Sequence, residues 1–123
     1  MQHSPGFLAI VDDAKTRVRE CTVADVERRL AKGEGFEFVD VREDNEVALE
    51  RAKGSRHIGR GVLERDVERL IPDKDTPIVL YCGGGFRSAL AADNLQKMGY
   101  TNVLSMAGGM RAWREADLPI EKG

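Results

Sequence analysis

The residues with the clearest chemical potential lie in one stretch, Ile78–Ser88, which reads Ile-Val-Leu-Tyr-Cys-Gly-Gly-Gly-Phe-Arg-Ser. Cys82 follows a short apolar run and precedes a glycine-rich loop. Five residues of this loop are candidates for holding a substrate: Gly83, Gly84, Gly85, Phe86 and Arg87. Glycines without a Cβ let backbone N–H groups turn toward one point, and a helix start and an arginine add positive charge. Such surroundings lower the pKa of a thiol, so the loop predicts that Cys82 is a nucleophile.

The flanking elements should place Cys82 at a strand end. Ile78–Tyr81 has the apolar, β-branched and aromatic composition of a buried strand in a parallel sheet. Ser88 is a suitable N-cap for a helix over Ala89–Met98. Ligands of open α/β sheets bind at the carboxyl ends of the strands, so a site is expected there.

Other polar residues are candidates for supporting this loop. Asp40 and Arg42 lie at the end of a predicted strand over Phe36–Val41. They could hold a substrate, but we interpret them, with Ser88, as residues that fix the loop through ion pairs or hydrogen bonds. His57 could be a general base for Cys82, although a lone histidine more often forms a structural hydrogen bond.

Helical and strand patterns alternate along the chain. Further strands are expected at Arg56–Ile58 and Thr101–Met106, and helical segments near 22–33, 42–49, 63–70 and 110–116. Thr22 opens a capping-box-like start, and Leu118–Ile120 is interpreted as a tail. This alternation predicts a mostly parallel sheet that is covered on both faces.

The first twenty residues are expected to form a helical extension that packs on a single domain over residues 21–123. Ser4-Pro5 is a typical helix start. Four apolar residues then recur at helical spacing: Phe7, Val11, Ala14 and Val18. This face could instead bind a partner.

Composition narrows the function classes. The chain has 123 residues, 41% hydrophobic and 33% charged, with a net charge of −2. No general attraction to nucleic acid or an anionic membrane is therefore expected.

The two cysteines, Cys21 and Cys82, do not form a CxxC pair, which argues against a zinc site and a disulfide scaffold. Cys21 is interpreted as a small apolar core residue. The N-terminus lacks signal-peptide features, and we expect a cytoplasmic protein with a reduced Cys82.

Four stretches together resemble the single-domain rhodaneses, a family of sulfurtransferases. They are Val39–Glu43, Gly54–Ile58, Val79–Ser88 and Leu104–Trp113, in the order in which the family has them. The resemblance implies a rhodanese-like α/β fold with about five mostly parallel strands and helices on both faces. It also implies that Cys82 is the nucleophile and that the backbone of Gly83 to Arg87 cradles the transferred sulfur.

The resemblance implies covalent chemistry without a metal or an organic cofactor. Cys82 would take sulfur from thiosulfate or a similar sulfane donor, become a persulfide, and pass the sulfur to cyanide or a thiol. Arg87, with Arg60 or Arg111 as further candidates, would help to bind the anionic donor. 

Three other interpretations stay open. The chain could be a relay module that passes persulfide sulfur to a protein partner, or a non-catalytic regulatory domain of the same fold. It could also be a cysteine-dependent phosphatase, because those enzymes share the order of strand, cysteine, anion-binding loop, arginine and helix. Their signature has five residues between cysteine and arginine, whereas four separate Cys82 from Arg87.

Overall fold

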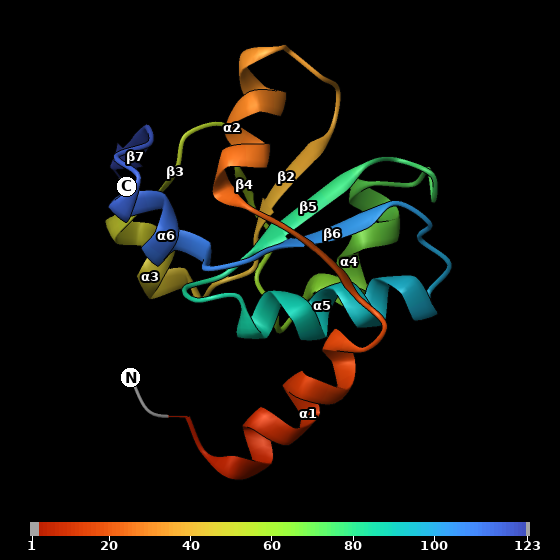
Figure 1. The fold of residues 1–123 in the computed structure, drawn as a ribbon. Helices are drawn as coiled ribbons and strands as arrows, with labels where there is room; N and C mark the ends of the chain where they lie inside the picture. The colour runs from red at the N-terminus through yellow and green to blue at the C-terminus, as the bar shows by residue number, and fades with distance from the viewer. Residues whose placement is uncertain (1–2, 123) are drawn as a thin grey trace.

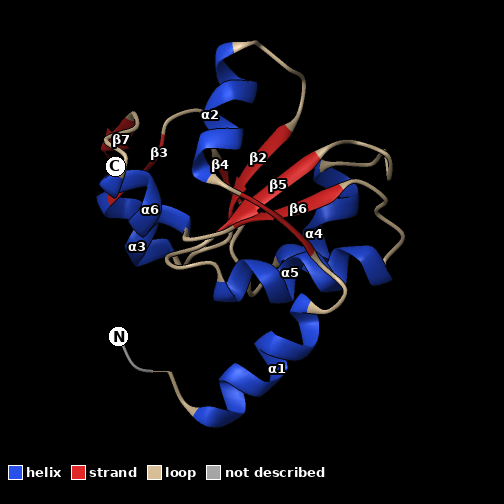
Figure 2. Cartoon of the chain, viewed as in Figure 1, coloured by secondary structure: helices blue, strands red, loops and turns tan. Residues whose placement is uncertain are grey.

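The structure, a computed structural model, describes residues 3–122. Its centre is a five-stranded parallel sheet with the strand order β1-β6-β5-β2-β4. The strands are β1 (Arg19–Cys21), β2 (Glu37–Asp40), β4 (Arg56–His57), β5 (Ile78–Tyr81) and β6 (Val103–Met106). The carboxyl ends of β2, β5 and β6 meet at one edge of the sheet (Figure 2), where sequence reasoning expected a site.

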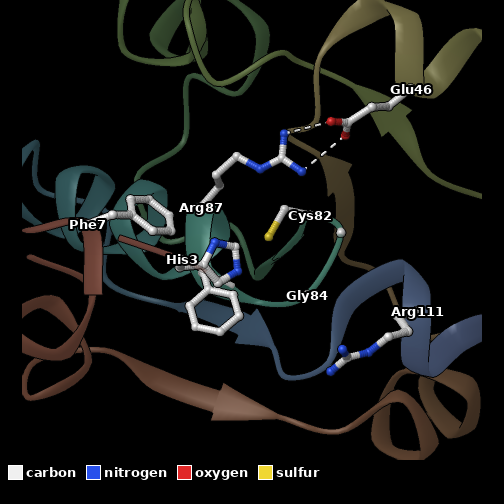
Figure 3. Close-up of a pocket in the computed structure, with 9 residues that line it drawn as sticks. His3, Phe7, Glu46, Cys82, Gly84, Arg87 and Arg111 are labelled. Atoms are coloured by element: carbon white, nitrogen blue, oxygen red, sulfur yellow. Dashed lines mark hydrogen bonds and ion pairs between the residues drawn. The ribbon is translucent and has the colours of Figure 1, made fainter. Parts of the chain in front are cut away.

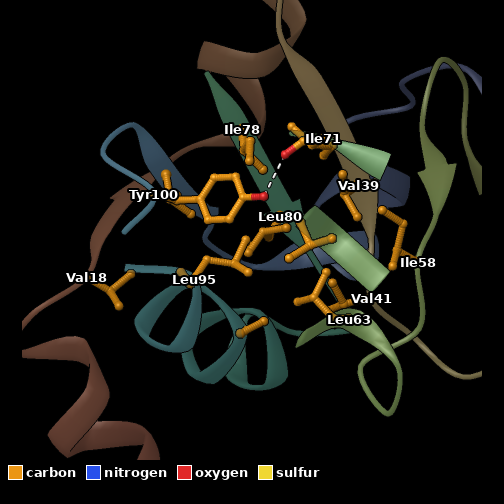
Figure 4. Close-up of a cluster of buried hydrophobic side chains, with 14 of the residues drawn as sticks. Val18, Val39, Val41, Ile58, Leu63, Ile71, Ile78, Leu80, Leu95 and Tyr100 are labelled. Atoms are coloured by element: carbon orange, nitrogen blue, oxygen red, sulfur yellow. Dashed lines mark hydrogen bonds between the residues drawn. The ribbon is translucent and has the colours of Figure 1, made fainter. Parts of the chain in front are cut away.

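Helices cover both faces of this sheet, which confirms the predicted α/β fold class (Figure 1). On one face lie α4 (Leu63–Leu70) and α5 (Phe86–Lys97), and on the other α2 (Val23–Ala31) and α6 (Gly109–Glu115). The central strand β5 is buried at all four positions, because its side chains alternate between two hydrophobic clusters. Figure 4 shows the cluster on the α4 and α5 face, with Tyr100 donating its hydroxyl hydrogen to the Ile71 carbonyl oxygen.

The N-terminal helix α1 (Pro5–Lys15) packs against the outer side of α5 (Figure 1). Val11 and Ala14 are buried in this contact. The guanidinium of Arg17 also donates to both carboxylate oxygens of Asp93 on α5, at 3.0 and 2.8 Å. Buried apolar contacts and a bidentate ion pair therefore fix the extension to the helix that follows Cys82.

Two short segments form a second, small sheet that the sequence did not reveal. The tail contributes β7 (Ile120–Lys122), which pairs antiparallel with β3 (Glu50–Ala52) directly after α3 (Asp44–Leu49). The capping box at Thr22 is confirmed by reciprocal hydrogen bonds with Asp25. Within residues 3–122, no helix is long and apolar enough to cross a membrane.

The helix after Cys82 begins three residues earlier than predicted, and Ser88 is not its N-cap. Gly85 is the N-cap and has a φ of +97°, which glycine adopts without the strain that a Cβ imposes. Ser88 is instead fully buried inside the first turn of α5, where its hydroxyl faces the sheet. Because α5 begins at Phe86, its first backbone N–H groups lie closer to Cys82 than those of a helix that begins at Ala89 would.

Candidate active site

A cavity of about 640 Å³ opens at the carboxyl edge of the sheet, beside the loop between β5 and α5. Cys82 lines it but is only 1% exposed. The residues around it come from the N-terminal segment with α1, from α3, from the β5–α5 loop with the start of α5, and from α6 (Figure 3). The lining residues are His3, Phe7, Glu46, Cys82, Gly83, Gly84, Phe86, Arg87 and Arg111. Only a narrow reactant can therefore reach the sulfur.

The sulfur of Cys82 accepts hydrogen bonds from backbone N–H groups at the start of α5. The Gly85 nitrogen lies 3.2 Å from Sγ and the Ser88 nitrogen 3.4 Å. Both donors belong to the positive end of the helix dipole. Two backbone N–H groups are therefore aimed at Sγ, the atom on which a sulfur nucleophile or a persulfide would be carried.

A pair of buried hydroxyls extends this network. Ser88 Oγ lies 3.6 Å from Cys82 Sγ and 2.8 Å from the Oγ of Ser105 on β6. A serine hydroxyl can donate as well as accept. Ser105 can therefore donate to Ser88 while Ser88 donates to a sulfur anion, and these contacts are compatible with a loop-supporting role for Ser88.

The arginine of the loop is already paired. Arg87 donates to both carboxylate oxygens of Glu46 on α3, at 3.0 and 3.1 Å (Figure 3). A bidentate pair of this kind is directional and strong for a partly exposed site. Arg87 thus lines the cavity, but much of its charge is balanced by Glu46, a partner that sequence reasoning did not identify.

The start of α6 holds the other side of the loop. The Met110 nitrogen donates to the Cys82 carbonyl oxygen at 2.8 Å, and the Arg111 nitrogen donates to the Gly83 carbonyl oxygen at 3.0 Å. Gly109 has a φ of +51°, and a Cβ there would lie 2.9 Å from the Gly83 carbonyl carbon and collide with the Cys82 carbonyl oxygen. The close approach of α6 to the loop therefore requires glycine at this position.

Comparison with known proteins assigns the family. The sequence profile described as "Rhodanese-like domain" matches residues 22–116. This chain belongs to the rhodanese-like family. It is 35% identical over 88 residues to the thiosulfate sulfurtransferase GlpE of Haemophilus influenzae, a match that covers 72% of this chain and 82% of that enzyme. A sulfurtransferase of Allochromatium vinosum is 31% identical over 103 residues, covering 84% of this chain and 94% of that one.

A solved structure matches this rhodanese-like chain along nearly its whole length. It is a protein of unknown function from Rhodopseudomonas palustris, also described as a possible tyrosine phosphatase. The two are 33% identical, with a TM-score of 0.87 and coverage of 98% of each chain. The likeness therefore includes the N-terminal helix, which lies outside the residues that the family profile matches.

Gly109 offers a test of how strictly the rhodanese-like loop depends on α6. We expect Gly109→Ala to lower the free energy of unfolding by about 3 kcal/mol, because the new Cβ overpacks the loop and alanine is strained at this φ. Urea denaturation measures the loss. Gly6→Ala is the matched control, since a Cβ at Gly6 in α1 meets nothing within 4 Å and should not destabilise the chain. Equal stability of the Gly109 variant and the wild type would contradict the close approach.

Asp40 and Arg42 pair with each other beneath the site and do not line the cavity. The Arg42 guanidinium donates to both Asp40 carboxylate oxygens and, at 2.6 Å, to the Glu50 carbonyl oxygen. His57 Nε2 lies 2.8 Å from the Arg42 carbonyl oxygen, in a different cavity from Cys82. These contacts favour structural roles and speak against a base at His57.

The structure also locates Cys21 and the two further arginines that were considered for the site. Burial raises the pKa of the Cys21 thiol to about 11, so Cys21 is protonated at neutral pH. Arg60 pairs with Glu64 at 2.6 Å and does not line the cavity of Cys82, whereas Arg111 does. Arg111 is therefore the better candidate of the two for contact with a substrate.

Sequence reasoning missed three lining residues: His3, Phe7 and Glu46. Phe7 was recognised only as part of an apolar helix face. No local sequence pattern predicts that the N-terminal end of α1 reaches the Cys82 loop, because the direction of α1 depends on its packing against α5. Glu46 lies 41 positions before Arg87 in the sequence, so their pairing depends on the placement of α3 beside the loop.

Proposed function

We propose that this protein moves sulfane sulfur from thiosulfate, or a similar anionic donor, to cyanide or a thiol through a persulfide on Cys82. The observation that carries the proposal is the environment of Sγ, which lies at the base of a cavity and accepts two backbone N–H groups from a helix start. Similarity to thiosulfate sulfurtransferases supports the same chemistry. 

In the first step, the thiolate of Cys82 attacks the outer sulfur of thiosulfate. A new sulfur–sulfur bond forms, and the old bond of thiosulfate breaks with its electron pair leaving on sulfite. The total charge is conserved, because thiolate and thiosulfate become persulfide anion and sulfite dianion. Backbone N–H groups of the loop would stabilise the persulfide anion as they stabilise the thiolate.

In the second step, an acceptor nucleophile attacks the outer sulfur of the persulfide. The bond to Sγ breaks, and its electron pair regenerates the Cys82 thiolate. Cyanide would leave as thiocyanate, and a thiolate would leave as a new persulfide. A relay to a protein thiol uses the same bond changes, so both forms of the proposal share the first step.

Steady-state kinetics with thiosulfate and cyanide test this proposal. We expect turnover with a double-displacement pattern, in which double-reciprocal plots at several cyanide concentrations are parallel. An aryl phosphate is assayed in parallel, because a cysteine-dependent phosphatase is an alternative with different chemistry. Turnover of the aryl phosphate without any thiocyanate formation would contradict the proposal and favour a phosphatase.

A further inference from the structure

The N-terminal extension supplies one wall of the cavity that contains Cys82. The His3 ring lies 4.4 Å from the Phe86 ring and 5.2 Å from the Phe7 ring, measured between centroids. Phe7 and Phe86 are 6.2 Å apart. These separations are typical of interacting aromatic rings. We call the three cavity-lining residues His3, Phe7 and Phe86 the aromatic wall; Figure 3 labels His3 and Phe7.

This wall is built on a fixed support. The buried side chains of Val11 and Ala14 attach α1 to α5, and Arg17 pairs with Asp93 at the far end of the helix. Lys15 Nζ also lies 5.3 Å from the centre of the Phe86 ring, within reach of a cation–π contact. The wall is therefore held in place without a ligand.

A second arginine lines this cavity and is not committed to a carboxylate. Arg111 extends from α6, whereas His3 and Phe7 come from the N-terminal segment (Figure 3). Arg87 is paired with Glu46, but no carboxylate within residues 3–122 lies in ion-pair distance of Arg111. An anionic group that enters the cavity would meet Arg111 without first breaking an ion pair.

The depth of Cys82 limits the shape of what can enter. Its side chain is 1% exposed, and a persulfide extends it by only about 2 Å, the length of a sulfur–sulfur bond. A thiol on a short, flexible stem can reach this depth. Its stem would then contact the aromatic wall.

On the basis of the sulfur transfer proposed above, we propose that the preferred acceptor is a small organic thiol that carries an acidic group. Its thiolate attacks the outer persulfide sulfur, its hydrocarbon stem packs on the aromatic wall, and its acidic group pairs with Arg111. The new sulfur–sulfur bond forms as the bond to Sγ breaks, and the electron pair returns to Cys82. His3, Phe7 and Arg111 thereby determine the choice of acceptor.

Discharge of the preloaded persulfide tests this inference without involving the donor. The full-length protein is loaded with thiosulfate, desalted, and mixed with 3-mercaptopropionate, cysteamine or cyanide in single-turnover experiments. Cyanide is too small to contact both the persulfide sulfur and the aromatic wall. For each variant, the rate of persulfide discharge by a thiol is therefore divided by the rate of its discharge by cyanide. This ratio is then compared with wild type for one thiol at a time, which cancels the intrinsic nucleophilicity of the thiol.

We expect Arg111→Gln to lower the ratio for 3-mercaptopropionate by about tenfold, because a charge-assisted contact is lost. The same variant should not lower the ratio for the cationic thiol cysteamine. His3→Ala and Phe7→Ala should each lower the ratio by about fivefold for both thiols, because the stem loses its apolar contact.

Two control variants change the same elements away from the cavity. Ile10→Ala removes an exposed apolar residue from α1, and Arg114→Gln removes a charge from α6, where Arg114 pairs with Glu50. Both should keep the wild-type ratios. If the persulfide loads but Arg111→Gln lowers both thiol ratios equally, or no variant changes them, the inference is wrong. Failure of the wild-type protein to load sulfur would instead contradict the proposed function.

Discussion

Cys82→Ser is expected to lower thiocyanate formation from thiosulfate and cyanide by at least about a thousandfold. The substitution removes the sulfur atom that receives the transferred sulfur in the proposed mechanism, and loss of a covalent nucleophile has effects of this size or larger. Serine is close to cysteine in size and can use the same N–H donors of Gly85 and Ser88. The fold should therefore survive, and the rate is measured on protein with unchanged circular dichroism.

Cys21→Ser is the matched control for this prediction. Cys21 is buried in the hydrophobic cluster on the α2 and α6 face and does not line the cavity of Cys82, and its raised pKa keeps it protonated. We expect this variant to retain turnover per folded molecule. Activity that survives in Cys82→Ser but disappears in Cys21→Ser would move the nucleophile to Cys21.

Arg42→Met is expected to destabilise the protein by about 3–5 kcal/mol, because it leaves the Asp40 carboxylate buried without its counter-charge. The two side chains are 4% and 0% exposed, so water can replace little of the lost interaction. This is a large part of the stability of about 5–15 kcal/mol that is typical of a domain. Urea denaturation measures the loss as a shift in midpoint at constant slope.

A double-mutant cycle shows whether loss of the Arg42–Asp40 ion pair causes the loss of stability. Combining Arg42→Met with Asp40→Asn removes both charges, and much of the stability lost in the single variant should return. Arg65→Met, which breaks an exposed pair with Asp66, should cost less than about 1 kcal/mol. If Arg42→Met costs no more than this control, the buried pair does not support the site as described.

The fold followed from local sequence patterns to a large extent. The apolar run of β5, the capping box at Thr22 and the alternation of helices and strands all reflect burial and hydrogen bonding within short segments. Family resemblance is confirmed over residues 22–116. The pairing of β3 with β7 was missed because it joins two three-residue segments about seventy positions apart, and neither has a strong strand pattern alone.

The site was harder to predict from the sequence than the fold, because several of its contacts join segments that are distant in the sequence. Ser88 looked like a helix cap, since serine near a helix start normally caps it, but its hydroxyl pairs with Ser105 on the neighbouring strand. Gly109 was not singled out as a site residue from the sequence, because its contact with the Cys82 loop depends on how α6 packs against that loop. Glu46 became visible only when α3 was placed beside Arg87.

The mass of the intact protein before and after treatment with thiosulfate tests the central claim most directly. A persulfide on Cys82 predicts a gain of one sulfur atom, about 32 Da, that cyanide removes and that peptide mapping assigns to Cys82. Cys82→Ser should gain nothing under the same conditions. An unmodified wild-type protein with a free, reactive Cys82 thiol, or a sulfur atom mapped to Cys21, would contradict the account.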